Sequence, residues 1–497
     1  MNHLHNLAER IKKHSTYIHK PACFILLFIA ASSTVSAQQK DVTFTSSDKK
    51  VEQAFKWAKD MALQYRGNPA DPSGPWYEGA LPTRNAFCMR DISHQCIGGE
   101  ILGMSRENFN MFNLFVSNIS ASKDWCSYWE INKWGKPAPE DYRNDNEFWY
   151  NLPANFDVLY ASWRLYLWTG DRRYINDATF DKFQQKTVNE YVDKWVLAPD
   201  SLLNRPLLPN KTKSFNPKDA FSTCRGLPSY SEGIPNLKVG IDLVSALYRA
   251  MLTYADILEL RGQKDQAAIY TKKAEAYRQH LENDWWDPQN SVYNALYGND
   301  GKFAKDPAET FLLWFDALKD TTRLNKTAAH VATINVNIEN TSYYPSLLYK
   351  YGRWADAKKY LLFVSDPSTP RREYPEVSYG VIQGVVLGLM GITPDARVRT
   401  ISTIFRTNEA GTAEIKSLPI MQTSIDINHL SHSRSILTNS GKKAFKWKAM
   451  FYGNYAKALV NNRLQAIKRE TDNQGNNISY LIVNAEPGST MDISMKK

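Results

Sequence analysis

Two adjacent residues, Arg90 and Asp91, have side chains suited to holding a hydroxyl-rich ligand. A planar guanidinium donates hydrogen bonds to two oxygens, and a neighbouring carboxylate accepts them from two hydroxyl groups. The pair lies where a loop enters a predicted helix, so Asp91 could instead serve only to start that helix. Arg84, His94 and Trp76 lie close by in the sequence, and their presence favours a ligand-binding role for the pair over a role in starting the helix. We therefore predict that this segment forms part of a ligand-binding cleft.

The first 37 residues have the features of an export signal. Four basic residues precede or flank an apolar run over 22–31, and Val35-Ser36-Ala37 supplies a small-residue cleavage motif. The run has about ten residues, too few to cross the ~30 Å apolar core of a bilayer, although an uncleaved anchor is the alternative. We expect the mature chain to begin near Gln38, after Ala37, to be periplasmic or secreted, and to have no stable membrane span.

The mature chain of about 460 residues is long enough for one large domain and a smaller one. Many of the 14 Trp and 27 Tyr fall in predicted loops, where flat rings suit sugar binding, although most aromatic residues are core filler. The formal charge falls from +10 to about +7 without the leader, and no dense Lys/Arg run occurs. A nucleic-acid partner is therefore not expected.

Four cysteines remain after the leader, namely Cys88, Cys96, Cys126 and Cys224. An exported protein could pair them in disulfides. Cys88 and Cys96 are too far apart to be bridged if one continuous helix carries both. The sequence has no C-x-x-C or H-E-x-x-H pattern, so we expect no metal site and no cofactor.

Helical periodicity extends from about residue 48 to 392. Tight turns, such as Thr169-Gly170-Asp171, alternate with longer connections rich in aromatic and charged residues. This alternation predicts a mainly α fold, an (α/α)6 toroid of six helical hairpins over 38–394. An open α-solenoid is the alternative, but no repeat of fixed length occurs. The helices are expected near 51–63, 87–102, 106–119, 154–168, 178–196, 239–261, 263–281, 309–318, 324–333, 342–351, 353–364 and 376–389. The long connections are 66–86, 120–153, 197–238, 284–308, 334–341 and 365–375.

From residue 395 to 497 the apolar period changes to two, which is typical of strands. This stretch predicts a small C-terminal antiparallel β-sheet or sandwich packed against the ring. The strands are expected at 400–405, 412–418, 423–430, 433–438, 445–452 and 479–485.

The helix order with a β-rich tail resembles the six-hairpin glycosidase-like superfamily over nearly the whole mature chain. The segment Phe87-Cys88-Met89-Arg90-Asp91 resembles an element that holds hydroxyl groups of the cleaved sugar in several of its families. Residues 419–439 are similar to the terminal sheet of such enzymes. The stretches 75–95 and 151–155 resemble glycoside hydrolase family 154 more specifically, which implies β-glucuronidase activity.

Glycoside hydrolysis uses two carboxyl groups, one as acid and one as base or nucleophile. In the superfamily that the chain resembles, inverting members take the acid from the loop before the sixth helix and the base from the loop before the twelfth. The first loop here contains Asp219 and Glu232, and the second contains Asp366, Glu373 and Glu376. Apolar neighbours could raise the pKa of Glu232, which suits an acid. We expect Glu232 to be the acid and Glu376, which opens the twelfth helix, to be the base.

Other residues complete the predicted cleft. Trp149 and Tyr150 lie in the long aromatic loop before the fourth helix, and Arg372 lies beside Glu376. An arginine at that place could bind the carboxylate of a uronic acid, or could be a solvated surface residue. Asp145, Glu147 and Asp157 are alternatives to Glu232 as the acid.

Together these features predict an exported glycosidase that removes a terminal sugar, of the uronic-acid type, from an oligosaccharide or polysaccharide. Two alternatives stay open. A polysaccharide lyase would use His94, Asn155, Tyr150 and Arg90 for β-elimination of uronate polymers. A non-catalytic glycan-binding protein would have the same fold without turnover.

Overall fold

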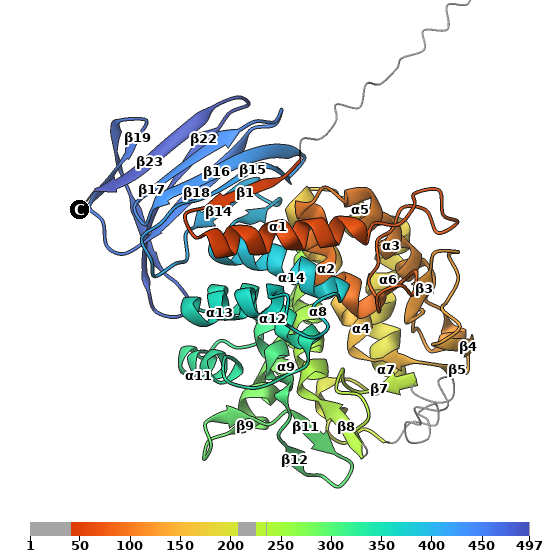
Figure 1. Cartoon of the computed structure of the whole chain (residues 1–497). Coiled ribbons are helices and arrows are strands. Elements are labelled where there is room, and N and C mark those ends of the chain that lie inside the picture. The colour runs from red at the N-terminus through yellow and green to blue at the C-terminus, as the bar shows by residue number, and fades with distance from the viewer. Residues whose placement is uncertain (1–40, 207–224, 235, 497) are drawn as a thin grey trace, which may run out of the picture. The chain divides into compact units, whose positions relative to one another are not determined.

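The computed structural model describes residues 41–206, 225–234 and 236–496. The expected leader, Asp219 and Cys224 lie outside these residues. Helices make up most of the described chain as far as residue 389, and strands make up most of it from Thr393 on (Figure 1). In the described ranges no helix is both long and apolar enough to cross a membrane.

Six helical segments form the inner wall of a closed ring. Each packs against the next in chain order, and the last packs against the first, which distinguishes the ring from an open solenoid. Because neighbours cover both of their sides, these helices are buried over most of their surface, including polar residues such as His94 and Glu100 in α2. They are α2 (Met89–Ile101), α4 (Pro153–Thr169), α8 (Ile241–Leu260), α10 (Thr310–Trp314), α12 (Ile338–Lys350) and α14 (Pro375–Gln383), the last with a π-helical continuation over Gly384–Leu389.

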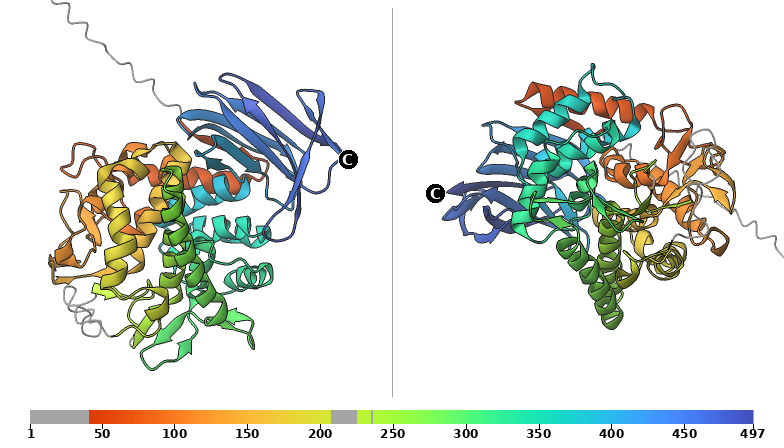
Figure 2. Two further views of the ribbon diagram at one scale, coloured as in Figure 1. Left: turned by 180° about the vertical axis from the view of Figure 1, so that it is seen from behind. Right: turned by 90° about the horizontal axis from the view of Figure 1, so that it is seen from below.

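The outer helices alternate with the inner ones along the chain. Figure 2 shows one such pair, α8 and α9, running side by side. Outer helices bury one face only: α9 buries four of its twenty residues. The outer set is α1 (Lys49–Gln64), α3 (Ser105–Ser117), α6 (Ala178–Lys186) with α7 (Val192–Lys194), α9 (Lys264–Asn283), α11 (Thr321–Val331) and α13 (Trp354–Ser365).

Several predicted helix bounds need correction. The second helix begins at Met89, because residues 86–88 form strand β2 (Ala86–Cys88) instead. The predicted helix over 178–196 is interrupted by a π-helical stretch at Thr187–Tyr191. The predicted helix over 309–318 is α10, which ends at Trp314.

The connections give the ring two different ends. Turns join the ends of the first five inner helices to the outer helices that follow them, as at Gly170 (φ 70°) and Gly262 (φ 76°), where a left-handed backbone suits glycine, whereas α14 leads into the sheets. Long connections enter the first turns of the inner helices, as the sequence predicts. All six positive dipole ends of the inner helices therefore meet at one end, which we call the loop end of the ring.

Two sheets follow the helices. The larger is ordered β1 (Thr43–Ser46), β15 (Ala413–Ile420), β16 (Thr423–Ser431), β17 (Arg434–Asn439), β23 (Thr490–Lys496), β19 (Lys457–Val460) and β20 (Arg463–Ala466). The smaller is ordered β13 (Thr393–Asp395), β14 (Thr400–Ile404), β18 (Phe445–Tyr452), β22 (Asn477–Ala485) and β21 (Lys468–Thr471).

The sheets differ from the prediction in three respects. Strand β1 comes from the N-terminal segment and pairs with β15, as the red strand among the blue ones in Figure 1 shows. Strands β14 and β18 are parallel, so the sheet is not antiparallel throughout. Strands β13, β19, β20, β21 and β23 were not predicted; β20 is exposed along its whole length and therefore has no alternating apolar pattern.

The sheets contact the end of the ring opposite the loop end. The indole Nε1 of Trp168, at the end of α4, donates to the carbonyl oxygen of Pro419 at 3.0 Å. The backbone N–H of Met421 donates to the carbonyl oxygen of Trp168 at 2.7 Å. His429 Nε2 lies 3.1 Å from the carbonyl oxygen of Met390. The sheets therefore cover the end of the ring that carries the tight turns. The loop end is formed by the helical part of the chain.

Candidate functional site

A cavity of about 400 Å³ lies at the loop end of the ring. Its walls come from the first turns of α2, α12 and α14 and from the connections before α2, α4, α8 and α14. Carboxylates outnumber cations in the lining. The carboxylates are Asp91, Glu130, Glu140, Asp141, Glu232, Glu339 and Glu376, and the cations are Arg84 and Arg90.

The structure brings six of the predicted residues together in this lining: Arg84, Arg90, Asp91, Trp149, Glu232 and Glu376. They come from positions between 84 and 376, so only the closure of the ring makes them neighbours. The two carboxylates predicted as acid and base therefore face the same cavity as the Arg90-Asp91 pair.

Arg90 is the central cation of the cavity. Its Nε lies 3.0 Å from Asp91 Oδ1, and its Nη2 lies 3.6 Å from Glu339 Oε2 and 3.7 Å from Glu376 Oε1. The guanidinium also lies over the ring of Tyr230, 5.7 Å from its centre. The single positive charge of Arg90 thus interacts with three acidic side chains, which come from the first turns of three neighbouring helices.

Glu376 is the most buried acid of this group, with 5% of its surface exposed. Neither carboxyl oxygen has a hydrogen-bond partner among the described residues. Burial raises the pKa of Glu376 well above its usual range, and the charge of Asp91 raises it further, while Arg90 opposes the shift. Ionisation of Glu376 therefore depends on Arg90 and on any positive charge that a bound molecule brings.

Glu232 lies between strands β7 (Arg225–Leu227) and β8 (Leu237–Gly240), in the connection before α8. Its side chain is accessible from the cavity. The surrounding protein nevertheless displaces enough water to raise the pKa of Glu232 to about 7. The charge of Arg90 opposes this rise, whereas nearby carboxylates, of which Glu339 has the largest effect, add to it. At neutral pH about half of these carboxyl groups hold a proton that can be transferred.

A second charged cluster surrounds Arg84. Its Nε lies 3.0 Å from Glu130 Oε1, and its Nη2 lies 3.2 Å from Asp141 Oδ2 and 3.8 Å from Glu140 Oε2. Burial, and then the charge of Asp141, raise the pKa of Glu130 to about 9. Strand β3 (Glu130–Asn132) pairs with β2, which sets Glu130 opposite Cys88 and so brings this cluster to the cavity.

Two tryptophans supply flat apolar surface to the cavity. Trp129 and Trp149 both line it, and each keeps 9% of its surface exposed. The Nε1 of Trp149 donates to Asn151 Oδ1 at 2.9 Å, which fixes its ring. Aromatic faces beside carboxylates and guanidinium groups suit a sugar, whose C–H faces are apolar and whose edges are polar.

Several lining residues were not predicted from the sequence, among them Glu339, Glu130, Asp141, Glu140, Trp129 and Tyr374. A signal for Glu339 was present: it is an acid in the first turn after a long connection, as Asp91 and Glu376 also are. Glu130 had no such signal, because its place depends on the pairing of β2 with β3.

Four residues predicted to bind the substrate lie away from the lining. His94 is buried inside the ring, 1% exposed, with its Nε2 2.6 Å from Asp157 Oδ2. Trp76 packs in the core and donates from Nε1 to Asp71 Oδ2 at 2.7 Å. Tyr150 is fully buried and its hydroxyl donates to Asn155. The side chain of Arg372 lies over the ring of Trp57 and donates to the carbonyl oxygen of Ser365 at 2.9 Å.

The alternative acids also lie outside the lining. Asp157, in the inner helix α4, is buried and paired with His94. Asp145 accepts a hydrogen bond from Tyr142, and Glu147 pairs with Arg143 at 3.0 Å on the surface. Asp366 and Glu373 are exposed. The lyase set is likewise not assembled, because His94, Tyr150 and Asn155 are all buried away from the cavity, which only Arg90 reaches.

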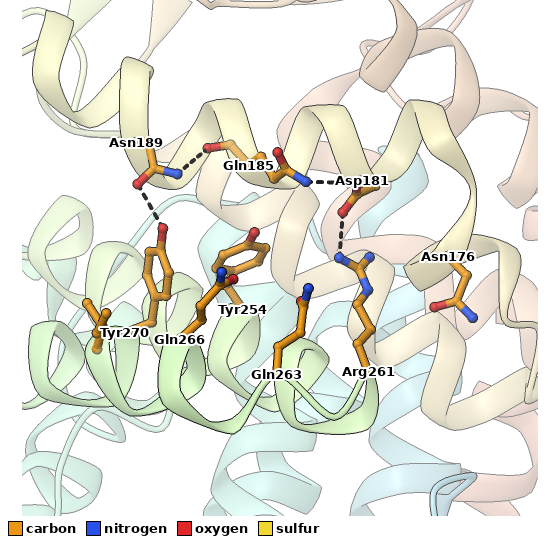
Figure 3. Close-up of a pocket in the computed structure, with 10 residues that line it drawn as sticks. Asn176, Asp181, Gln185, Asn189, Tyr254, Arg261, Gln263, Gln266 and Tyr270 are labelled. Carbon is orange, nitrogen blue, oxygen red and sulfur yellow. Dashed lines mark hydrogen bonds and ion pairs between the residues drawn. The ribbon is translucent and has the colours of Figure 1, made fainter.

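A larger cavity, about 720 Å³, opens between the outer helices α6 and α9. Figure 3 shows its lining of amide and tyrosine side chains. Its single carboxylate, Asp181, pairs with Arg261 and accepts a hydrogen bond from Gln185 at 2.7 Å. Of these two cavities, only the smaller one at the loop end has more than one carboxyl group in its lining.

Three of the cysteines lie in the described ranges. No group of three or more His, Cys, Asp or Glu side chains there has the arrangement of a metal site. Cys88, Cys96 and Cys126 are buried free thiols. Burial raises the pKa of all three thiols, which disfavours the reactive thiolate.

The fold is similar to solved structures of carbohydrate-active enzymes. An alpha-L-rhamnosidase from Dictyoglumus thermophilum superposes with a TM-score of 0.56 and 13% identity, over 92% of this chain and 51% of that one. A GH78 family rhamnosidase of Bacillus sp. GL1 has a TM-score of 0.56 and 12% identity, over 80% and 40%. A protein described as a kojibiose phosphorylase, from the human microbiome, has a TM-score of 0.53 and 10% identity, over 90% and 68%.

These similarities concern the fold. The chain spans about half or less of the length of the two rhamnosidases. No family model matches the sequence, and no curated protein matches it. The helical ring and its β-rich tail therefore give this chain a fold similar to that of the six-hairpin glycosidases.

Proposed function

We propose that the protein is a glycoside hydrolase that acts in the cavity at the loop end of the ring. The observation that carries this proposal is the meeting of Glu232, Glu376 and the Arg90-Asp91 pair in one cavity with two tryptophan faces. Hydrolysis of a glycosidic bond needs one carboxyl group that gives a proton and one carboxylate that activates water or attacks.

Glu232 is the acid in this proposal. Its carboxyl group is accessible from the cavity, and its pKa of about 7 keeps a proton available at neutral pH. Protonation of the glycosidic oxygen by Glu232 lets the leaving group depart as a neutral alcohol. The aglycone then leaves through the open mouth of the cavity.

Glu376 is the base, with Arg90 as its counter-charge. The positive charge that develops on the sugar during bond cleavage favours the ionised form of Glu376. The ionised carboxylate takes a proton from water as the water attacks the anomeric carbon. If the enzyme inverts the anomer, the two carboxyl groups lie about 6.5–9.5 Å apart in the reacting complex; about 5–5.5 Å would accompany retention.

An uncharged terminal sugar suits the cavity better than a uronic acid. Seven acidic residues line it, enough that the pKa values of Glu130, Glu232 and Glu376 are raised, and both of its cations are already paired with acids. A uronate would place another negative charge there, which costs binding free energy. Among the described residues of the lining, no unpaired cation is left to offset that cost. Arg372, which the uronate prediction used, lies over Trp57 outside the lining. The resemblance to family 154 and its β-glucuronidase activity remains the weaker proposal.

A screen of nitrophenyl glycosides tests this proposal. The panel contains α-L-rhamnoside, α-D-mannoside, α- and β-D-glucoside and β-D-glucuronide, assayed with wild type, Glu232→Gln and Glu376→Gln. Release of nitrophenol from a neutral glycoside, lost in both variants, is the expected result. Hydrolysis of the glucuronide alone would overturn the uncharged-sugar assignment. An unsaturated, ultraviolet-absorbing product from a uronate polymer would instead indicate a lyase.

We also propose that the protein is exported, on the basis of residues 1–37. The mature N-terminus is then close to Gln38. Expression of the full chain in a Gram-negative host, followed by fractionation and N-terminal sequencing, tests this. Recovery of the uncleaved chain in the membrane fraction would contradict it.

A further inference from the structure

A buried carboxylate, Asp242, accepts two of the hydrogen bonds that attach the segment carrying Glu232 to the ring. Asp242, the second residue of α8, accepts a hydrogen bond from Ser229 Oγ at 2.9 Å and another from the backbone N–H of Tyr230 at 2.5 Å. Asp242 is fully buried. Its two oxygens thus hold two consecutive residues, and Glu232 follows them at the second position along the chain.

This contact requires a glycine at position 240. A Cβ atom on Gly240 would lie 2.2 Å from Asp242 Oδ1 and 2.5 Å from Ser229 Oγ. Both distances are shorter than any tolerable contact, so a larger residue would push the segment and the carboxylate apart. Because the φ of Gly240 is −96°, the requirement concerns space and not backbone conformation.

Three further hydrogen bonds hold the same segment from other sides. Asn151 Nδ2 donates to the carbonyl oxygen of Ser229 at 2.7 Å, and the hydroxyl of Tyr230 donates to Asp157 Oδ2 at 3.1 Å. Ser231 Oγ donates to Asp306 Oδ2 at 2.6 Å. The polar groups of the segment therefore point into the protein, while Glu232 faces the cavity.

We propose that Asp242 is the positioning residue for the general acid Glu232. It is absent from the lining of the cavity, so it acts through the segment and not on the substrate. Its two hydrogen bonds set the direction in which the chain leaves Tyr230 and hence the place of the Glu232 carboxyl group. The inference rests on the proposed function, because it assigns Asp242 to the acid of that reaction.

The basicity of the leaving group provides a readout that separates positioning from general structural damage. A dinitrophenolate is a weak base and leaves without protonation, whereas phenolate needs a proton from the acid. A misplaced acid therefore slows a phenyl glycoside strongly and a 2,4-dinitrophenyl glycoside weakly. A general disturbance of the cavity slows both.

The experiment measures kcat and KM for the phenyl and 2,4-dinitrophenyl glycosides of the sugar that the screen above identifies. Asp242→Ala removes both hydrogen bonds, and Asp242→Asn keeps the shape, one acceptor and one amide group. Ser245→Ala, one turn further along α8, is the matched control: its buried hydroxyl donates to the carbonyl oxygen of Ile241 and does not touch the segment.

We expect Asp242→Ala to lower kcat for the phenyl glycoside about 10- to 100-fold, with KM and the dinitrophenyl rate near those of wild type. Glu232→Gln should show the same selectivity with a larger loss, about 10²–10⁴-fold. Asp242→Asn should recover most of the rate, because its amide can donate to Ser229 Oγ while its oxygen accepts from Tyr230. If Asp242→Ala does not fold, Gly240→Ala and Ser229→Ala should show the selective loss.

Equal slowing of both substrates in the Asp242 or Gly240 variants would overturn the positioning role while leaving the proposed function intact. Wild-type rates in Asp242→Ala would do the same. Glu232→Gln without leaving-group selectivity would mean that Glu232 is not the acid, and both proposals would then fail together.

Discussion

The guanidinium of Arg90 lies 3.7 Å from the carboxyl group of Glu376, between the first turns of two adjacent inner helices, α2 and α14. The same cation contacts Asp91 and Glu339, so it balances three acids in a cavity where carboxylates predominate. Its charge therefore controls whether Glu376 can ionise.

Removal of the Arg90 charge should impair the base. With Arg90→Met, the pKa of Glu376 rises further, since only burial and like charges then act on it. We expect kcat/KM to fall at least 100-fold at pH 7 and the acid limb of the pH profile to shift to higher pH. Arg371→Met is the control, because Arg371 is exposed and lies outside the cavity lining. An unchanged acid limb in Arg90→Met would contradict the role of Arg90.

Replacement of the base should be rescued by an external nucleophile. We expect Glu376→Gln to lose about 10²–10⁴-fold in kcat, the usual contribution of a general base. Azide needs no deprotonation, so it should restore turnover and give a glycosyl azide of inverted configuration, which proton NMR can identify. A variant with wild-type activity would remove Glu376 from the reaction, and Glu339 would become the next candidate.

The pH dependence of activity should report the acid. Glu232 must be protonated to act, and its pKa is about 7, so kcat/KM should fall about tenfold per pH unit above pH 7. In Glu232→Gln this basic limb should disappear from the residual activity on a 2,4-dinitrophenyl glycoside. Persistence of the limb in that variant would assign it to another group.

A buried carboxyl group outside the cavity should make stability depend on pH. Burial raises the pKa of Glu100 from its ordinary 4.5 to about 7, and hydrogen bonds from Ser105 and Asn108 oppose this shift. Between these two values the folded state binds the proton and the unfolded state releases it, so this stabilisation is complete below about pH 4.5 and is lost as the pH rises to about 7.

Urea unfolding at pH 5 and pH 8 measures this effect. Relative to Glu100→Gln, wild type should lose up to about 3 kcal/mol of unfolding free energy between these pH values. Glu259→Gln, an exposed glutamate on α8, should leave the pH dependence as it is in wild type. If Glu100→Gln and wild type showed the same pH dependence of unfolding, Glu100 would not be the group that makes stability depend on pH.

The His94–Asp157 pair should matter for stability. Both side chains are 1% exposed, and His94 is surrounded by the rings of Trp314 and Tyr343. His94→Phe leaves Asp157 buried with only the hydroxyl of Tyr230 as partner, which should cost about 3–5 kcal/mol in urea unfolding.

The double variant His94→Phe/Asp157→Leu should recover part of this loss, since it leaves no unpaired buried carboxylate. A loss below about 1 kcal/mol in His94→Phe would show that the pair contributes little. At a temperature where His94→Phe is folded, this single variant should bind substrate about as well as wild type, because His94 does not reach the cavity.

Much of the fold follows from the sequence because its signals are local. The three- and four-residue spacing in α8 and the glycine at its end mark that helix without reference to the rest of the chain. Alternating tight and long connections also predict which end of the ring carries the loops. Strand β1 escaped prediction because four residues acquire strand structure only by pairing with β15, which lies more than 360 residues away.

The residues of the cavity were predictable to a smaller extent. Arg90, Asp91 and Glu376 have first-turn positions that the sequence reveals, and all three line the cavity. His94 and Tyr150 have equally suitable chemistry and similar places in the sequence, yet both point into the core. A side chain one position further along a helix or strand points in a different direction, and this can decide whether it lines the cavity or packs in the core. In a helix that is buried on all sides, the spacing of apolar residues does not show which side faces the cavity.

By itself, the sequence determined the alternation of helices, the change to strands near residue 393 and the polar pair at the start of α2. Local periodicity and turn chemistry suffice for these, since they depend on neighbours a few residues apart. Only the tertiary structure decided which carboxylates share one cavity, that Arg84 and Arg90 are both already paired, and that Asp242 holds the segment of Glu232. Those relationships join residues up to about 290 positions apart, and they exist because α14 packs against α2 and closes the ring.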